Sequence, residues 1–178
     1  AITLAYNCYE SMFAGCTNLT NINLSNVTTI GICAFSSCSS LTELDLSEEL
    51  DYIDNSAFSY CTNLTSIGKI PSTVTYLGDS AFSSCSKLTT VGGIPSGVTY
   101  IGGGCFSGCK NLSDAIIIPK GVTEILDYTF NECQNIPSVK LHNEITEIGK
   151  RAFMNCSSIK ELTIPESVTS LPENVFSN

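Results

Sequence analysis

The sequence predicts an α/β solenoid, a curved right-handed stack of units of about 23 residues, with a parallel β-sheet on one face and short helical or turn segments opposite. Two observations predict this fold. Phenylalanine returns about every 22 to 24 residues, at Phe13, Phe35, Phe58, Phe82, Phe106, Phe130, Phe153 and Phe176. A cysteine follows three residues after all but the last of these, at Cys16, Cys38, Cys61, Cys85, Cys109, Cys133 and Cys156. A motif that recurs at a fixed period marks one structural unit per repeat.

Apolar residues at fixed distances after the cysteine predict the strand of each unit. The third residue after each cysteine is Leu or Ile, and the pattern that follows is L-x-x-L-x-L. Its second apolar column is Ile22, Leu44, Ile67, Val91, Ala115, Val139 and Leu162, and its third is Leu24, Leu46, Ile70, Ile94, Ile118, Leu141 and Ile164. Three units hold one extra residue, at Gly68-Lys69, Gly92-Gly93 and Ile116-Ile117. This pattern is the signature of a leucine-rich repeat.

The rest of each unit predicts a turn and the opposite face of the stack. An apolar residue and a threonine follow the strand, and then often Gly-x-x-Ala-Phe, which predicts a turn that opens a short helical segment with Ala and Phe inward. A unit this short cannot bury its own apolar residues, so the core forms only when units stack. At roughly 4.8 Å per unit, such a stack is roughly 35 Å long.

The cysteine column is expected to belong to this core, because free cysteine behaves as a small buried hydrophobe with a weak hydrogen-bond donor. Stacked neighbours would still lie within the Cα distance of a disulfide, so a bridged column is the alternative. Cys8 and Cys105 replace core residues, whereas Cys33 takes a position held by serine in the next units and is the best candidate for an exposed thiol. No Cys-x-x-Cys pair occurs, so no metal site is expected.

Composition excludes several classes of function. The net charge of −9 is spread along 178 residues, and a chain without a basic stripe lacks the electrostatic footprint of nucleic-acid binding. No apolar run approaches the ~20 residues of a membrane-spanning helix, so no membrane insertion is expected. The one histidine, His142, stands where other units have proline, and the pattern places no nucleophile with it. We therefore expect no enzyme, no catalytic residue and no cofactor.

Residues 70–91 and 94–115 follow I-P-x-x-V-T-x-I-G-x-x-A-F-x-x-C-x-x-L-x-x-V nearly intact. This consensus resembles the BspA-like, treponemal-type leucine-rich repeats, and the resemblance covers essentially the whole chain. It implies the solenoid fold and an extended binding scaffold. Such repeats occur in large surface or secreted proteins of host-associated bacteria and of some protists, where they are implicated in adhesion, so an extracellular or cell-surface location is implied. No functional residue carries over, because the matching positions are structural.

One surface column is a candidate for binding. Tyr52, Tyr76 and Tyr100 hold the same position in three successive units, and Glu124 and Glu147 hold it in the next two. Tyrosine combines apolar area with a polar tip, which suits contact with a protein or a glycan. The alternative is an aromatic ladder that stabilises stacked units.

A second candidate lies on the predicted strand, whose variable positions form a polar, nearly aromatic-free strip. Ile116 or Ile117 should protrude from this strip, and we place Ile117 there as an apolar anchor. The alternative is an isolated exposed apolar residue. Paired carboxylates such as Glu43 and Asp45 are expected to be solvated surface charge.

We expect residues 1–178 to form a single solenoid that acts as a non-enzymatic recognition or adhesion module. It would be surface-displayed or secreted and would bind a protein or glycan on a host or microbial surface. The alternative is a structural spacer or assembly scaffold without a specific ligand. The sequence has no polar unit at its end, which stacks of this kind need for solubility. The chain is therefore expected to be a fragment of a longer protein, or to associate end to end with another copy.

Overall fold

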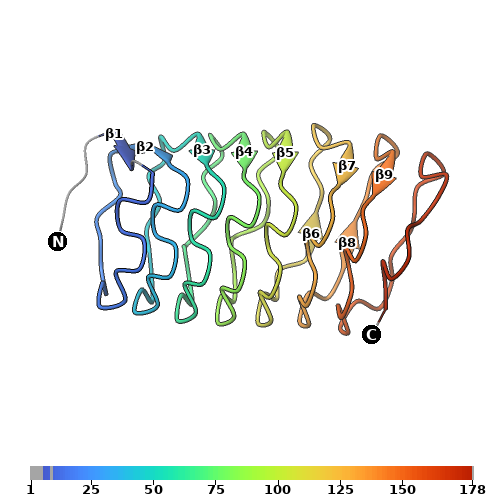
Figure 1. Ribbon diagram of the computed structural model, residues 1–178. Helices are drawn as coiled ribbons and strands as arrows, with labels where there is room; N and C mark the ends of the chain where they lie inside the picture. The colour runs from blue at the N-terminus through green and yellow to red at the C-terminus, as the bar shows by residue number, and fades with distance from the viewer. Residues whose placement is uncertain (1–5, 9, 178) are drawn as a thin grey trace.

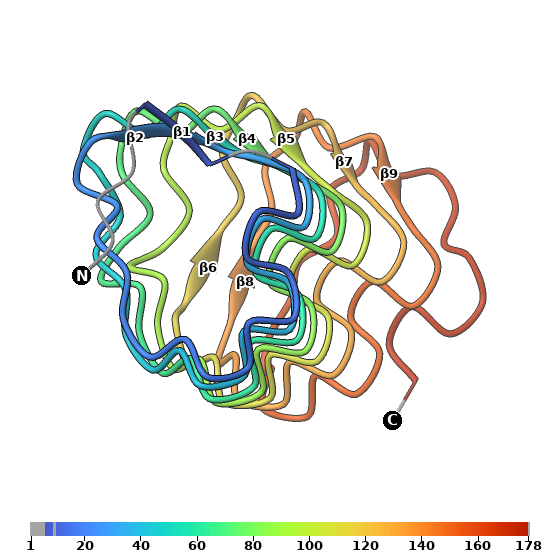
Figure 2. The ribbon, with the colours of Figure 1, turned by 60° about the vertical axis from the view of Figure 1, so that its left-hand side comes forward.

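The computed structural model describes residues 6–8 and 10–177, which form a continuous stack of similar coils (Figure 1). From a second direction, successive coils repeat nearly the same outline (Figure 2). Parallel strands from successive units lie side by side, and apolar residues fill the interior. The predicted leucine-rich-repeat fold is confirmed.

Nine short strands occur in the described residues. They are β1 (Tyr6–Cys8), β2 (Val27–Ile30), β3 (Tyr52–Ile53), β4 (Tyr76–Leu77), β5 (Tyr100–Ile101), β6 (Ile116–Ile117), β7 (Glu124–Ile125), β8 (Val139–Lys140) and β9 (Glu147–Ile148). Strands β1 to β5 pair in parallel and in sequence order, whereas β6 pairs with β8 and β7 with β9. Paired strands come from successive units, so the backbone bonds hold one unit to the next.

The longest sheet does not lie on the L-x-x-L-x-L segment, where the sequence predicted it. That segment holds the β6–β8 pair and three isolated bridges, whereas β1 to β5 lie on the segment that precedes each phenylalanine. The two segments differ in how constant their length is from one unit to the next. Eight positions separate Val74 from Phe82, and every unit from Val27 onward keeps this spacing, but the distance from the column cysteine to that apolar residue grows from 11 positions at Cys16 to 13 at Cys61. Constant spacing keeps neighbouring strands in register before each phenylalanine, whereas the length after the column cysteine is not constant along the chain.

Ala115 was expected in the buried apolar column, and this prediction is wrong. Ala115 is exposed, while Ile116 is buried and pairs with Val139. The extra residue of this unit therefore precedes the buried position instead of following it. The Asp114 carboxylate accepts a hydrogen bond from the backbone N–H of Val91 at 2.7 Å, so a side chain replaces a backbone acceptor at the insertion.

The segment from glycine to cysteine consists of turns, and no helix occurs in the described residues. Some N–H groups bond within the unit, as Cys38 N–H does to Phe35 C=O at 3.1 Å. Others bond to the next unit, as Phe35 N–H does to Ala57 C=O at 2.8 Å. Ser37 stands in the left-handed region with φ 61°, which reverses the chain between such bonds. Short helical or turn segments were expected here, and the structure has turns. Some of their N–H groups bond across units.

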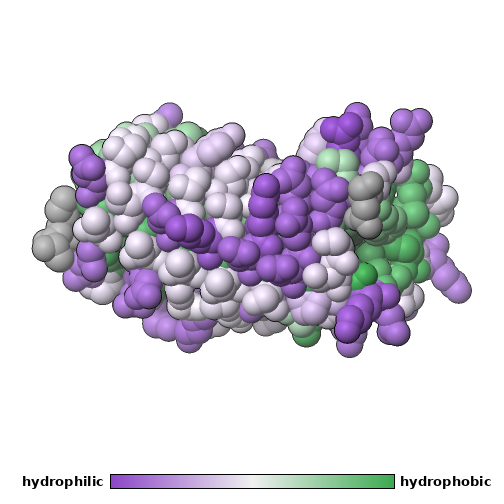
Figure 3. All heavy atoms as spheres, turned by 90° about the horizontal axis from the view of Figure 1, so that it is seen from below, coloured by the Kyte–Doolittle hydropathy of each residue, from purple (hydrophilic) through white to green (hydrophobic). Residues whose placement is uncertain are grey.

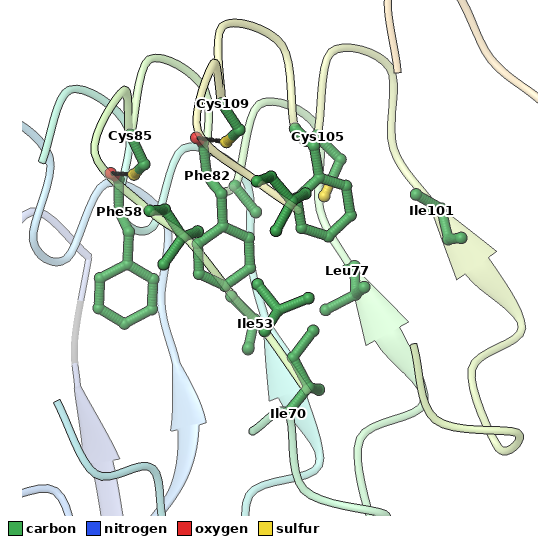
Figure 4. Packing of buried hydrophobic residues seen from close by; sticks show 14 of the residues in the cluster. Ile53, Phe58, Ile70, Leu77, Phe82, Cys85, Ile101, Cys105 and Cys109 are labelled. Atoms are coloured by element: carbon green, nitrogen blue, oxygen red, sulfur yellow. Dashed lines mark hydrogen bonds between the residues drawn. The ribbon is translucent and has the colours of Figure 1, made fainter. Parts of the chain in front are cut away.

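The phenylalanine column forms the centre of the core. Neighbouring rings from Phe13 to Phe176 stack nearly parallel, with centroid distances that rise from 5.3 to 5.8 Å along the chain. Aliphatic residues of the strands, such as Ile53, Leu77 and Ile101, pack in the same interior (Figure 4). Every unit therefore contributes the same side chain to one continuous core.

A ladder of thiols runs beside the rings. Each buried column cysteine donates from Sγ to the carbonyl oxygen of the phenylalanine in the preceding unit, over 3.0 to 3.2 Å, and Figure 4 shows two of these bonds, from Cys85 to Phe58 and from Cys109 to Phe82. Burial raises the pKa of the Cys61 thiol to about 12, with a further contribution from the neighbouring Cys38. The thiols are therefore neutral donors at physiological pH.

The other cysteines differ in their surroundings. Cys105 is fully buried in the position of an alanine, and Cys33 is partly exposed at a turn with φ 54°. Cys16, which was expected in the core, is exposed. The backbone of Cys8 pairs with Ile30, and its side chain lies outside the described part of the chain. The nine cysteines from Cys16 onward are free.

The last coil leaves apolar side chains uncovered. Phe176 and Leu171 are 42% and 47% exposed, and a hollow of about 260 Å³ beside Phe176 is lined by Phe153 and Leu162. In Figure 3 apolar residues gather at this end of the molecule. An end-to-end partner for this surface stays a prediction.

Candidate binding surface

The three tyrosines of the candidate column begin β3, β4 and β5 and lie in register. The rings of Tyr52 and Tyr76 stack with centroids 4.1 Å apart, and those of Tyr76 and Tyr100 with centroids 4.7 Å apart. All three are half-buried, because the residue after each tyrosine points into the core and the tyrosine points outward. The ring edges and hydroxyl groups therefore form an outward row, while the faces between neighbours are covered.

The environment of Tyr76 and Tyr100 keeps their hydroxyl groups protonated. Burial raises the pKa of Tyr76, and its neighbours Tyr52 and Tyr100 raise it further. Burial also raises the pKa of Tyr100, and its hydroxyl donates to Asp79 Oδ1 at 3.1 Å. Tyr76 and Tyr100 thus present neutral hydroxyl groups, which can donate and accept hydrogen bonds.

The tyrosine row ends where the sheet ends. Between β4 and β5, Thr99 N–H donates to Thr75 C=O at 2.9 Å and Gly102 N–H to Leu77 C=O at 2.8 Å. The equivalent bonds between β5 and β7 do not form among the described residues, and β7 pairs only with β9. The carbonyl groups at the outer edge of β5 and the N–H groups at the facing edge of β7 are therefore left without backbone partners.

Leu126 stands at this break in a position that is glycine in both flanking units. A Cβ atom on Gly102 would lie 2.3 Å from the backbone nitrogen of Asp79, and one on Gly149 would lie 2.5 Å from that of Asp127, so these glycines allow a close approach of units. Asp54 occupies the same position in an earlier unit and carries a Cβ, yet its N–H still donates to Ile30 C=O at 2.9 Å. The bulk of the leucine side chain, more than the presence of a Cβ, therefore accounts for the separation.

Gly103 weakens the same junction. In three other units the equivalent residues are Asn55, Asp79 and Asp127, and each accepts a backbone N–H of the next unit on its side-chain oxygen, at 2.6 to 2.8 Å. Gly103 has no side chain and offers no such acceptor. Two departures from the repeat, Gly103 and Leu126, thus meet at one junction.

Two adjoining hollows open at this break, and together we call them the β5–β7 hollow. The larger has a volume of about 630 Å³, and its lining includes Tyr100, Leu126 and Glu147. The smaller has a volume of about 160 Å³ and shares Tyr100 and Leu126, with Glu124 in its lining. Asp79 and Asp127 also line the larger part, and no lysine or arginine lines either. The β5–β7 hollow is therefore acidic, and two aromatic side chains, Tyr100 and Tyr128, contribute to its lining.

Comparison with known proteins assigns the fold family. Residues 6–113 and 91–178 match the model of the BspA type leucine rich repeat region, in six copies. The chain belongs to this family. BspA-type repeats suggest a protein-binding or adhesion module, and leucine-rich-repeat folds of this kind are generally non-enzymatic. No curated protein matches the sequence.

The chain is also similar to solved structures of other leucine-rich repeat proteins. The Treponema pallidum leucine-rich-repeat protein TpLRR is 30% identical with a TM-score of 0.78, over 88% of this chain and 72% of that chain. A leucine-rich repeat protein from Bacteroides ovatus is 21% identical with a TM-score of 0.45, over 88% and 63% of the two chains. A leucine rich cell surface protein from Faecalibacterium prausnitzii is 21% identical with a TM-score of 0.33, over 97% and 74%.

In this BspA-type solenoid the candidate residues divide between two surfaces. Tyr100 and Glu147 line one hollow and Glu124 lines its extension, whereas Ile117 is 61% exposed on β6, in a different sheet. Ile117 lies in register with Lys140 on β8, so it is not part of the tyrosine row. The structure brings the tyrosine and glutamate candidates together and leaves Ile117 apart.

Three residues of the BspA-type surface were missed by the sequence reasoning. Asp79 and Asp127 occupy a variable position, and Leu126 interrupts the Ile-Gly pair of the consensus. The interruption is visible in the sequence once the repeats are aligned, but its effect on pairing requires the distances between units. No helix of the described residues is long and apolar enough to cross a membrane, and no cluster of potential metal ligands occurs in them.

Proposed function

We propose that this chain is a non-enzymatic recognition module, surface-displayed or secreted, which binds protein or glycan ligands through the face formed by β3, β4 and β5. The observation that carries the proposal is the row of half-exposed tyrosines, held in register and stacked at 4.1 and 4.7 Å. Membership of the BspA-type family supports it, because these repeats suggest a protein-binding or adhesion module.

The three tyrosine rings are ordered in the absence of a ligand. Stacking and strand pairing fix the three rings before a ligand arrives, so little side-chain entropy is lost on binding. The edges give apolar contact area, and the protonated hydroxyl groups give hydrogen bonds at strand spacing. A repeating polymer, either an extended peptide or a glycan, can contact the tyrosines of more than one solenoid unit.

The test uses the triple variant Tyr52→Ala/Tyr76→Ala/Tyr100→Ala on a glycan array and an immobilised peptide array. Tyr60→Ala is the matched control, because Tyr60 is 58% exposed and lies on the turn side, outside the row. The triple variant should lose the binding that the native chain shows, and the control should retain it. If the folded triple variant keeps the same binding, the tyrosine face is not the binding face.

A structural spacer is the second candidate, and the unbroken stack of rings from Phe13 to Phe176 favours it. A spacer depends on length and not on surface chemistry. Deleting one whole unit, residues 74–97, should then impair the function while the tyrosine variants leave it intact. The opposite result would assign the function to the tyrosine face.

A further inference from the structure

We propose that the β5–β7 hollow binds an arginine side chain carried by an extended segment of a partner protein. This inference rests on the proposed recognition function and names the partner chemistry at the end of the tyrosine row. Three features of the hollow carry it: unpaired strand edges, uncompensated carboxylates and a free aromatic face.

The strand edges supply main-chain partners. The carbonyl groups of Thr99 and Ile101 point where a further strand would pair, and so do the N–H groups of Thr123 and Leu126, by comparison with the bonds at the flanking junctions. Unpaired edges of this kind bind extended segments by main-chain hydrogen bonds. An extended partner segment can therefore lie along the edge and direct a side chain into the hollow.

The carboxylates select the charge of that side chain. Glu124 and Glu147 lie directly opposite each other on β7 and β9, and both are exposed. Like charges opposite each other on neighbouring strands destabilise the pair. The ion pairs of the described residues are Lys69 with Glu48 and Lys110 with Glu132, so neither glutamate of the hollow has one. A cation placed between β5 and β7 relieves this repulsion.

The aromatic wall favours a flat cation. One face of Tyr100 is covered by Tyr76, and Glu124 follows on β7 where the next ring would stand. The other face of Tyr100 is thus available to a guanidinium group, which is attracted to an aromatic ring within about 6 Å. The rim already holds such a contact, because the Arg151 guanidinium lies 5.8 Å from the Tyr128 ring centroid.

Arginine fits this combination better than lysine does. Its planar group has five N–H donors, which can reach carboxylates and backbone carbonyl oxygens while the plane lies on a ring. Asp79 and Asp127 are already held in place, because each accepts a backbone N–H of the following unit, at 2.8 and 2.6 Å. The acceptors are therefore positioned before the guanidinium arrives.

The test is an NMR titration of the chain with a capped seven-residue peptide of alternating threonine and valine around one central arginine. The control peptide carries citrulline, a neutral side chain of the same shape. The arginine peptide should shift the amides of Tyr100, Leu126 and Glu147, and the citrulline peptide should bind at least about tenfold more weakly. Absence of shifts, or equal binding of both peptides, would overturn the proposal.

Variants locate the site. Glu124→Gln/Glu147→Gln should weaken the arginine peptide at least about tenfold, whereas Glu161→Gln, an exposed carboxylate in a later unit, should have no effect. Gly103→Asn/Leu126→Gly introduces residues that other units hold at these positions, as Asn55 and Gly102 do, and should remove binding by closing the hollow. Binding that survives both double variants would overturn the proposal. Calcium ions that shift the same amides and displace the peptide would assign the hollow to a metal ion instead.

The arrays separate this inference from the function on which it rests. Array binding that needs Tyr52 and Tyr76, without an arginine-dependent shift in the titration, would keep the recognition function and overturn the arginine site. Arginine binding in the hollow, with array binding independent of Tyr52 and Tyr76, would keep the site and overturn the tyrosine face.

Discussion

The thiol of Cys85 fills space in the core and donates a hydrogen bond at the same time. Its acceptor, Phe58 C=O, lies in the preceding unit at 3.1 Å, so the bond joins two units and not two residues of one turn. Alanine could fill part of this space but could not donate. The repeated cysteine is thus explained by packing together with a bond between units.

Replacing this residue tests both contributions. Cys85→Ala should lower the free energy of unfolding by about 1 to 3 kcal/mol, because it removes a hydrogen bond and leaves a small cavity. Cys16→Ala should change it by less than about 0.5 kcal/mol, because Cys16 is exposed. Urea unfolding measures both. Equal effects of the two substitutions on the free energy of unfolding would show that the buried Cys85 contributes no more to stability than the exposed Cys16 does.

The raised thiol pKa values predict a dependence of stability on alkaline pH. Burial raises the pKa of Cys38 to about 11 and that of Cys156 to about 12, from an ordinary value of 9.0. Above pH 9 the unfolded chain loses these protons while the folded chain keeps them, so the free energy of unfolding should fall as pH rises through 9 toward 12, and should not depend on these groups below pH 9.

The pKa values of the half-buried Tyr76 and Tyr100 are raised as well, so the measurement compares variants. Urea unfolding at several pH values between about 7.5 and 10.5 should give a steeper decline for the native chain than for Cys61→Ala. Parallel declines would exclude the Cys61 thiol as a source of the pH dependence.

At the scale of elements, the repeat period predicts which residues are buried but not which segment forms the sheet. Phe82, Cys85 and Leu88 recur in register, and this suffices to place them in the core. The segment that carries β1 to β5 has the same length before each phenylalanine, whereas the length after the column cysteine varies between 11 and 13 positions along the chain. Ala115 was wrongly expected in the buried column, because a count of residues cannot say on which side of a buried position an insertion lies.

The break between β5 and β7 occurs where this spacing is unchanged, so side chains and not chain length account for it, and it can be reversed. Gly103→Asn/Leu126→Gly introduces residues that other units hold at these positions, so Thr123 N–H and residue 126 N–H should pair with β5. Two hydrogen bonds at about 1 kcal/mol each are partly offset by about 1 kcal/mol for the added glycine, so the change in stability should be small.

The decisive measurement for this change is amide hydrogen exchange. The amides of Thr123 and residue 126 should exchange at least about tenfold more slowly in the double variant. Leu126→Ile keeps the bulk at this position and should leave both amides unprotected. Rapid exchange in the double variant would mean that Gly103 and Leu126 do not cause the break.

At the scale of the molecule, each unit contacts only its neighbours, so stability is close to a sum of unit and junction terms. The acidic hollow lies at a junction where the sheet ladder is missing, while the turn-side bond from Gly104 N–H to Asp127 C=O persists at 2.8 Å. The phenylalanine stack also continues across this junction, from Phe106 to Phe130, with centroids 5.7 Å apart. The core therefore holds the stack together where the sheet ladder is missing.

This arrangement makes Phe106 the residue on which the two halves of the stack depend. Phe106→Ala should cost about 3 to 5 kcal/mol, because the ring is fully buried, whereas Phe176→Ala should cost about 1 kcal/mol, because that ring is 42% exposed and stacks only on Phe153. The Phe106 variant should also unfold in two steps, since the weakened junction no longer couples the units before and after it. Urea unfolding followed by amide exchange distinguishes the halves. A single transition with equal loss of protection in both halves would show that junctions elsewhere keep the stack cooperative without this ring.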